Sequence, residues 1–159
     1  MMVGAEFERT IDAIVAKYPE PKAALLPVLW EVQKAKGWID LSSEEWVAKR
    51  LGVAPSHVHG CVTFYTMYKP QPSGRHHIQL CTTLSCMLRG CDELQAHLEK
   101  KLGIKPGETT PDGKFSLARV ECLGSCGTAP MFQLNDDFHE NLTIESVDRL
   151  LESLDKAGA

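Results

Sequence analysis

Two pairs of cysteines, each placed directly after a strand-like segment, set the strongest limit on how this chain folds. Cys81 and Cys86 follow the segment HHIQL, and Cys122 and Cys126 follow FSLARVE. If the two strands are neighbours in one sheet, all four sulfurs emerge at the same end of it. The sequence therefore favours a sheet that gathers four thiols at one edge.

Four thiols in this arrangement suit a metal site. Structural disulfides are disfavoured in a reducing cytosol, so clustered cysteines there more often bind metal or carry redox chemistry. Iron–sulfur clusters and zinc ions both accept four thiolates. Zinc knuckles usually leave two residues between paired ligands, whereas four residues separate Cys81 from Cys86 and three separate Cys122 from Cys126. This spacing favours one [2Fe–2S] cluster, with a four-cysteine zinc-binding structural or interaction module as the alternative.

Residues near these cysteines supply donors to negatively charged sulfur. Glycine lets a backbone N–H group approach closely, and Gly124 and Gly127 flank Cys126. Further candidate donors are four hydroxyl groups, those of Thr82, Thr83, Ser85 and Ser125. We expect these groups to stabilise the charge of the ligated sulfurs.

Two further cysteines stand outside the expected ligand set. Cys61 lies in a helical segment and is expected to pack in a core, as free cysteine often does. Cys91 follows Cys86 by five residues, and the geometry of one continuous helix turns the two side chains about 140° apart. We therefore expect Cys91 to face the core or the solvent, and in solvent it would be open to oxidation.

A run of prolines, glycine and polar residues, KPQPSGRHH at 69–77, divides the chain. Before it, apolar residues recur at helical spacing in four segments: 5–18, 21–37, 41–53 and 55–68. We expect Gly37 to end the second helix. Ser42 or Ser43 is the expected N-cap of the third helix, and Ser56 that of the fourth.

After this division the pattern changes to short strands. Apolar segments of strand type lie at 76–81, 115–122, 129–136 and from 136 onward. Amphipathic segments predict helices over 85–103 and 143–154, the second capped by Thr143. We therefore expect an α+β protein, with an N-terminal helical bundle at 1–70 and a small layered sheet domain at 71–159.

Composition and motif content exclude several function classes. A net charge of −4 argues against a nucleic-acid partner, and a helix-turn-helix-like segment at 44–65 lacks the basic residues of a DNA reader. No apolar run reaches the roughly 18 residues of a spanning helix, and no signal peptide is evident. We therefore expect a cytoplasmic protein without direct membrane insertion. Because no nucleotide-binding glycine motif or catalytic residue pair is found, this chain alone is expected to hold no complete active site.

The chain resembles a known family over nearly its whole length, from about residue 7 to the C-terminal helix. The resemblance lies in the segments CTTLSC, ECLGSCGTAP, KGWI, HVHGCVTFYTMY, LGIKPGETTPDGKFSL and FQLND. These segments are similar to the thioredoxin-like [2Fe–2S] ferredoxin family, which includes the E subunit of NADH-quinone oxidoreductase (respiratory complex I).

The resemblance implies a thioredoxin-like domain at 71–159 in which four cysteines bind one [2Fe–2S] cluster. The implied ligands are Cys81, Cys86, Cys122 and Cys126. It also implies a partner subunit that binds FMN and NADH, single-electron exchange with its flavin, and further iron–sulfur subunits in a complex that could associate the chain with a membrane. Small subunits of NAD-linked hydrogenases and formate dehydrogenases share this module and are the alternative, with a free-standing ferredoxin as a third hypothesis.

Overall fold

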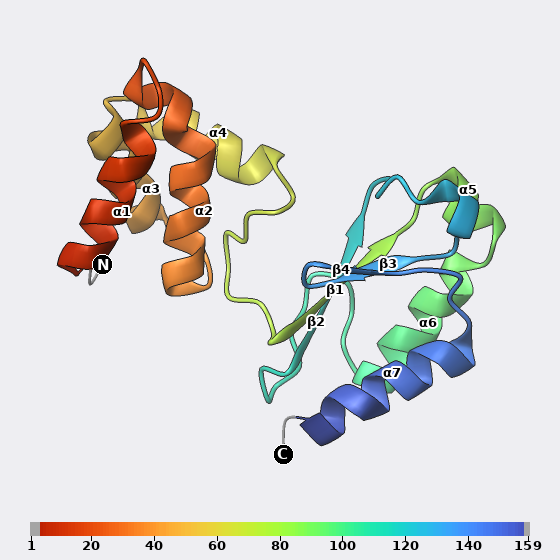
Figure 1. Ribbon diagram of the computed structural model, residues 1–159. Helices are drawn as coiled ribbons and strands as arrows, with labels where there is room; N and C mark the ends of the chain where they lie inside the picture. Colours follow the sequence, from red (N-terminus) through yellow and green to blue (C-terminus); the bar gives the residue numbers. More distant parts are fainter. Residues whose placement is uncertain (1–3, 158–159) are drawn as a thin grey trace. The chain divides into compact units, whose positions relative to one another are not determined.

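The computed structural model describes residues 4–157, and the chain divides into two compact units, Met1–Pro72 and Ser73–Ala159 (Figure 1). The first unit is helical, and the second combines helices with one four-stranded sheet. The α+β class predicted from the sequence is therefore confirmed. Within residues 4–157, no helix is both long enough and apolar enough to cross a membrane.

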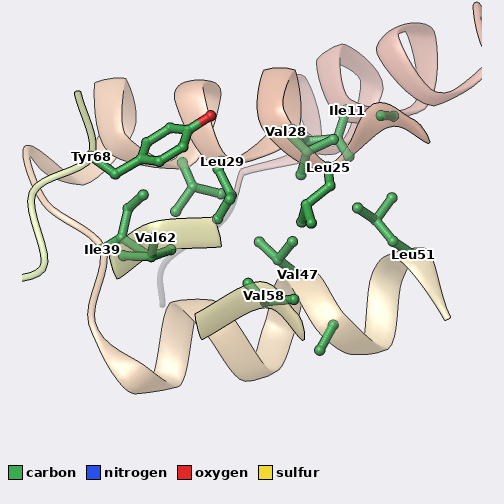
Figure 2. Packing of buried hydrophobic residues seen from close by; sticks show 13 residues of the cluster. Ile11, Leu25, Val28, Leu29, Ile39, Val47, Leu51, Val58, Val62 and Tyr68 are labelled. Carbon is green, nitrogen blue, oxygen red and sulfur yellow. The ribbon is translucent and has the colours of Figure 1, made fainter. Parts of the chain in front are cut away.

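The first unit is a small bundle of helices. Its elements are α1 (Ala5–Val15), the 3-10 helix η1 (Pro21–Ala24), α2 (Leu25–Lys36), α3 (Leu41–Leu51) and α4 (Pro55–Phe64). Apolar side chains at helical spacing enter one shared core, in which Val28, Leu29 and Val47 are fully buried. Figure 2 shows the labelled side chains facing one another between the helices. The helical segments predicted before residue 69 are thus present.

Capping residues fix where α2 ends and α3 begins. Gly37 ends α2 in a left-handed conformation with φ of 89°, as predicted. Asp40, rather than Ser42 or Ser43, is the N-cap of α3, because its carboxylate accepts a hydrogen bond from the Ser43 backbone N–H at 2.9 Å. The two serine hydroxyls themselves donate to Asp40. The predicted N-cap of α3, Ser42 or Ser43, is therefore wrong, because the cap lies two or three residues earlier at Asp40.

The fourth helix also begins differently from the prediction. α4 starts at Pro55, directly after Ala54, and no side chain caps it. Proline is favoured at the first helical position because it has no N–H group to satisfy and its φ is already helical. The predicted cap at Ser56 is therefore wrong, since Ser56 is the second residue of the helix.

The second unit is built around four strands (Figure 1). Its elements are β1 (His76–Cys81), α5 (Leu84–Leu88), α6 (Cys91–Leu102), β2 (Phe115–Val120), η2 (Cys126–Thr128), β3 (Phe132–Leu134), β4 (Asp137–His139) and α7 (Ile144–Ala157). The strand order is β2-β1-β3-β4, in which β1 and β2 are parallel and the other neighbours antiparallel. Thr143 caps α7, as predicted, by accepting a hydrogen bond from the Ser146 N–H at 3.2 Å.

Two long helices of this unit pack together beside the sheet. Figure 1 shows α6 and α7 side by side, and Asp148 on α7 is hydrogen-bonded to His97 and Lys101 on α6 at 2.8 and 2.7 Å. Apolar residues from both helices and from the strands form one core. Its buried members include Ile78, Leu98, Phe132 and Val147.

The single helix predicted over 85–103 is broken in two. α5 ends at Leu88 and α6 begins at Cys91, with Gly90 between them at φ of 91°. Glycine takes this left-handed conformation at no steric cost, so it permits a sharp change of direction. Because Cys86 and Cys91 lie on separate helices, the angle expected between them on one helix does not apply.

Candidate metal centre

The parallel pairing of β1 with β2 brings both cysteine pairs to one end of the sheet. Cys81 ends β1 and lies opposite Val120, the last residue of β2. Cys122 follows Val120 by two positions. The two strands are therefore neighbours, which is the condition on which the sequence prediction rested.

Cys122 and Cys126 form an exposed pair whose sulfur atoms lie 3.8 Å apart. A tetrahedral metal with sulfur ligands at ~2.3 Å holds any two of them ~3.8 Å apart. Gly124, at φ of 84°, turns the loop so that its backbone N–H donates to Cys122 Sγ at 3.4 Å. The loop thus presents two sulfurs at the separation of two ligands on one metal.

Hydrogen bonds favour the thiolate form of Cys122. The Gly124 N–H contributes most, followed by the Cys126 thiol and the Thr83 hydroxyl, and together they lower the pKa of Cys122. The thiolate is the form that binds metal. The same donors would stabilise negative charge on the sulfur once it is ligated.

Cys81 and Cys86 form a second pair, which is almost fully buried. α5 begins just after Thr83 and places Cys86 in one buried cluster with Cys81. Burial, with a further contribution from Cys81, raises the pKa of Cys86 to about 11. Burial acts on Cys81 in the same direction, but hydrogen bonds donated by Thr83 and by the Leu123 N–H outweigh it and lower the pKa of Cys81.

Thr83 connects the two pairs. Its hydroxyl lies 3.3 Å from Cys81 Sγ and also contributes to the lowered pKa of Cys122. The Leu123 backbone N–H, from the other loop, contributes to the lowered pKa of Cys81. The structure therefore places both predicted pairs at the same end of the sheet, and within the exposed pair the two sulfur atoms lie 3.8 Å apart. That these sulfurs bind metal stays a prediction.

Two of the hydroxyl groups expected to reach sulfur have other partners. The Thr82 hydroxyl donates to the Val120 carbonyl at 3.4 Å. The Ser125 hydroxyl donates to the carboxylate of Glu140, a residue that the sequence pattern does not single out. Nothing in the local sequence marks Glu140, because its contact with Ser125 depends on the return of the chain after β4.

Of the two remaining cysteines, Cys91 is buried and Cys61 is partly buried. Cys61 packs against the helical core, as expected. Cys91 is fully buried beside Cys81 and Cys86, so it faces the core and the alternative of a solvent-exposed, oxidation-prone thiol is wrong. Burial first, and then the Asp92 carboxylate, raise the pKa of Cys91, which favours its protonated form.

The sheet with its thiol-lined end defines a class of protein. Residues 11–155 match the family described as "Thioredoxin-like [2Fe-2S] ferredoxin". The match spans most of the chain, and the chain belongs to this family. The resemblance found in the sequence, and with it the thioredoxin-like fold, is therefore confirmed.

Relatives within the family are named as subunits of oxidoreductases. The chain is 48% identical over 143 residues to the E 2 subunit of NADH-quinone oxidoreductase from Rhizobium meliloti (strain 1021), and the match covers 90% of this chain and 85% of that protein. It is 45% identical over 147 residues to "NADH-quinone oxidoreductase subunit 2" of Thermus thermophilus, with 91% and 81% covered. "NADH dehydrogenase [ubiquinone] flavoprotein 2, mitochondrial" of Dictyostelium discoideum is 44% identical, with 91% of this chain and 60% of that protein covered.

A solved structure shares the fold at lower identity. It is described as "Crystal structure of NAD+-reducing [NiFe]-hydrogenase in the air-oxidized state" and superposes with a TM-score of 0.71 at 22% identity. The match covers 84% of this chain and 23% of that chain. This likeness shows a common fold.

The residues at the end of the sheet fit a [2Fe–2S] cluster. Such a cluster takes four thiolate ligands shared between two irons. The chain supplies thiols alone, as one buried pair and one exposed pair, with backbone and hydroxyl donors directed at sulfur. Within residues 4–157, no three histidine, cysteine or carboxylate side chains are arranged around one metal position.

Proposed function

We propose that this chain is an electron-transfer subunit of an NADH-oxidising complex. In this proposal one [2Fe–2S] cluster is held by Cys81, Cys86, Cys122 and Cys126. The parallel register of β1 and β2 carries the proposal, because it gathers the two cysteine pairs at one end of the sheet. Membership of a [2Fe–2S] ferredoxin family and relatives named as subunits of NADH-quinone oxidoreductase support it.

The surroundings of the four sulfurs suit this role. A bound [2Fe–2S] cluster would accept and return single electrons. Burial of Cys81 and Cys86 excludes water from one side of the site, whereas exposure of Cys122 and Cys126 leaves the other side accessible to a redox partner. Donors such as the Gly124 N–H stabilise negative charge on sulfur. This charge increases when the cluster is reduced.

The proposed partner is a subunit that binds FMN and NADH, with which this chain exchanges single electrons. Further iron–sulfur subunits would belong to the same complex. Relatives at 45% and 48% identity carry the name NADH-quinone oxidoreductase, so we favour that host. An NAD-linked hydrogenase is the alternative host, because a protein described as an NAD+-reducing hydrogenase shares the fold.

Metal analysis and EPR spectroscopy test the proposed cluster. Protein purified without oxygen should contain iron and acid-labile sulfide in equal amounts, and dithionite should produce one rhombic [2Fe–2S] signal. Cys122→Ser should lose or alter this signal, whereas Cys61→Ser, in the helical unit, should keep it. Zinc without sulfide, or an unchanged signal in Cys122→Ser, would contradict the proposal.

Isolation of the native complex tests the proposed host. An affinity tag on this chain should co-purify a flavoprotein that oxidises NADH and passes electrons to a quinone. Hydrogen uptake coupled to NAD+ reduction would instead identify the alternative host. Recovery of the chain alone from gently lysed cells would favour a free-standing ferredoxin.

A further inference from the structure

A carboxylate outside the proposed ligand set is bound to the loop that carries Cys126. Glu140, which follows β4, accepts hydrogen bonds through Oε1 from the hydroxyls of Ser125 and Thr128, the latter at 2.5 Å. The two hydroxyl oxygens lie 2.7 Å apart, so the three oxygens form one compact group. Ser125 directly precedes Cys126, and Thr128 ends η2. One carboxylate oxygen therefore binds both ends of the turn that contains Cys126.

Backbone hydrogen bonds keep Glu140 opposite this turn. The Asn141 N–H donates to the Thr128 carbonyl at 2.7 Å, and the Leu142 N–H donates to the Pro130 carbonyl at 3.0 Å. The two residues after Glu140 are therefore paired with the end of η2 and the segment that follows it. The backbone of Glu140 thus stays near the turn, and the hydroxyls of Ser125 and Thr128 are the hydrogen-bond partners of its carboxylate.

The three-oxygen group of Glu140, Ser125 and Thr128 stabilises the conformation of the loop that carries Cys126. The sulfur atoms of Cys122 and Cys126 lie 3.8 Å apart, the separation of two ligands on one metal, only while the turn between them keeps its shape. Hydrogen bonds from hydroxyls to a carboxylate are charge-assisted and stronger than those between neutral groups. The contact with Glu140 therefore resists opening of the turn. The Ser125 hydroxyl serves this contact rather than donating to sulfur.

We infer that Glu140 is a positioning residue for the cluster, because it holds Cys122 and Cys126 at ligand spacing through the hydroxyls of Ser125 and Thr128. The inference rests on the proposed function, since it concerns a cluster bound by these cysteines. Without the carboxylate, the turn opens more often and the two sulfurs separate more often. Iron is then released faster, and the ligand geometry of the remaining clusters becomes more variable.

The test uses the cluster-loaded full chain. Iron release to a ferrous chelator is followed through the visible absorbance of the cluster, and the EPR signal is recorded after reduction. Glu140→Ala should release iron about tenfold faster than the wild type, as expected for loss of charge-assisted hydrogen bonds, and should broaden the EPR lines. Thr128→Val should act in the same direction, whereas Thr128→Ser keeps the hydroxyl and should restore both readouts.

A matched control separates this contact from a general effect of charge. Glu121→Ala removes an exposed carboxylate adjacent to Cys122 that takes no part in the three-oxygen group, and it should leave iron release and the EPR signal unchanged. Combining Glu140→Ala with Ser125→Ala should add little to Glu140→Ala alone, because both remove the same contact. If Glu140→Ala yields no folded protein, the comparison of Thr128→Val with Thr128→Ser decides the question.

The possible outcomes separate failure of the proposed function from failure of this inference. A wild-type chain without a [2Fe–2S] cluster overturns the proposed function and this inference with it. A wild-type chain that holds the cluster, with Glu140→Ala and Thr128→Val releasing iron at the wild-type rate and with an unchanged EPR signal, overturns this inference alone. Equal acceleration by Glu121→Ala also overturns it, because charge rather than the contact would then control iron release.

Discussion

The two cysteine pairs of one site lie in different surroundings. Cys81 and Cys86 are almost fully buried, whereas Cys122 and Cys126 are exposed. Burial disfavours negative charge on sulfur, so the buried pair depends more strongly on hydrogen-bond donors. Thr83 acts on both pairs, because its hydroxyl lies 3.3 Å from Cys81 Sγ and contributes to the lowered pKa of Cys122. One hydroxyl thus acts on a buried and on an exposed sulfur.

Replacement of Thr83 by valine should lower the reduction potential of the cluster. Valine keeps the shape of threonine but removes a donor that favours the more negative, reduced state. A hydrogen bond with a net value of ~1 kcal/mol corresponds to ~40 mV for a one-electron couple. A redox titration followed by EPR measures the shift. Thr82→Val is the matched control, since the Thr82 hydroxyl donates to the Val120 carbonyl, and an equal shift in both variants would count against the role of Thr83.

At the scale of elements, the ends of the helices decide how the first unit is assembled. Asp40 caps α3 through the Ser43 N–H and also forms an ion pair with Lys36, the last residue of α2. It therefore joins the end of one helix to the start of the next. The Lys36 ammonium first, and then Ser43, hold the pKa of Asp40 well below its usual range.

Asp40→Ala should reduce the free energy of unfolding of the first unit by ~1 kcal/mol, the usual cost of losing an N-cap. A carboxyl whose pKa is lowered on folding adds stability above its unfolded pKa, and this stability is lost as pH falls toward the folded pKa. The difference between variant and wild type should therefore shrink below about pH 4. Urea unfolding followed by circular dichroism measures both effects. Ser56→Ala is the control and should be nearly neutral, because Ser56 caps no helix.

Periodicity predicted the succession of elements because it records which face of each element is buried, a property carried by the residues themselves. The cap of α3 could not be chosen in this way, because Asp40, Ser42 and Ser43 are all good N-cap residues and the position of Lys36 in space favours Asp40. The break at Gly90 was missed for a similar reason. The apolar pattern continues across it, and only the tertiary fold requires the left-handed φ.

The candidate site was only partly visible in the sequence. Spacing and strand placement singled out the two cysteine pairs, because parallel pairing of their strands was enough to bring them together. The contact between Glu140 and Ser125 joins residues 15 positions apart through the turn after β4, so no local pattern predicts it. Ser125 was accordingly assigned to sulfur, although its hydroxyl binds a carboxylate.

Gly74→Ala should destabilise the second unit by roughly 1–3 kcal/mol, the range for overpacking a closed site. A Cβ atom at Gly74 would lie 2.5 Å from the backbone carbonyl carbon of Phe115 and 2.8 Å from the Ser116 nitrogen. Backbone atoms cannot move aside as a side chain can, so the start of β1 would be pushed away from β2. The urea midpoint of this unit measures the loss. Gly60→Ala is the control, because a Cβ atom at this position of α4 meets no atom within 4 Å, and it should stabilise the first unit by ~0.5–1 kcal/mol. An unchanged urea midpoint in Gly74→Ala would show that the close approach of Gly74 to Phe115 can be relieved without cost.

At the scale of the whole molecule, the hydrophobic cores follow the division into two units. The helical core takes its buried residues from the first unit. The sheet core and the cluster of buried cysteines take theirs from the second. Because an independent core is what a domain needs in order to fold, the predicted boundary at residues 70 and 71 can be tested directly.

A chain divided at this boundary should give two folded fragments. Fragment 71–159 retains all four proposed ligands together with β1 and β2, so it should take up the cluster and show the EPR signal of the full chain. Fragment 1–70 retains Tyr68, whose hydroxyl donates to the Leu26 carbonyl at 2.8 Å and which is buried in the helical core, and it should unfold cooperatively in urea. A shorter fragment, 1–60, lacks Val62 and Tyr68 and should not fold, because their loss opens the core seen in Figure 2. If fragment 71–159 remained unfolded under conditions in which the full chain binds its cluster, the second unit would depend on the first and the boundary would have to be abandoned.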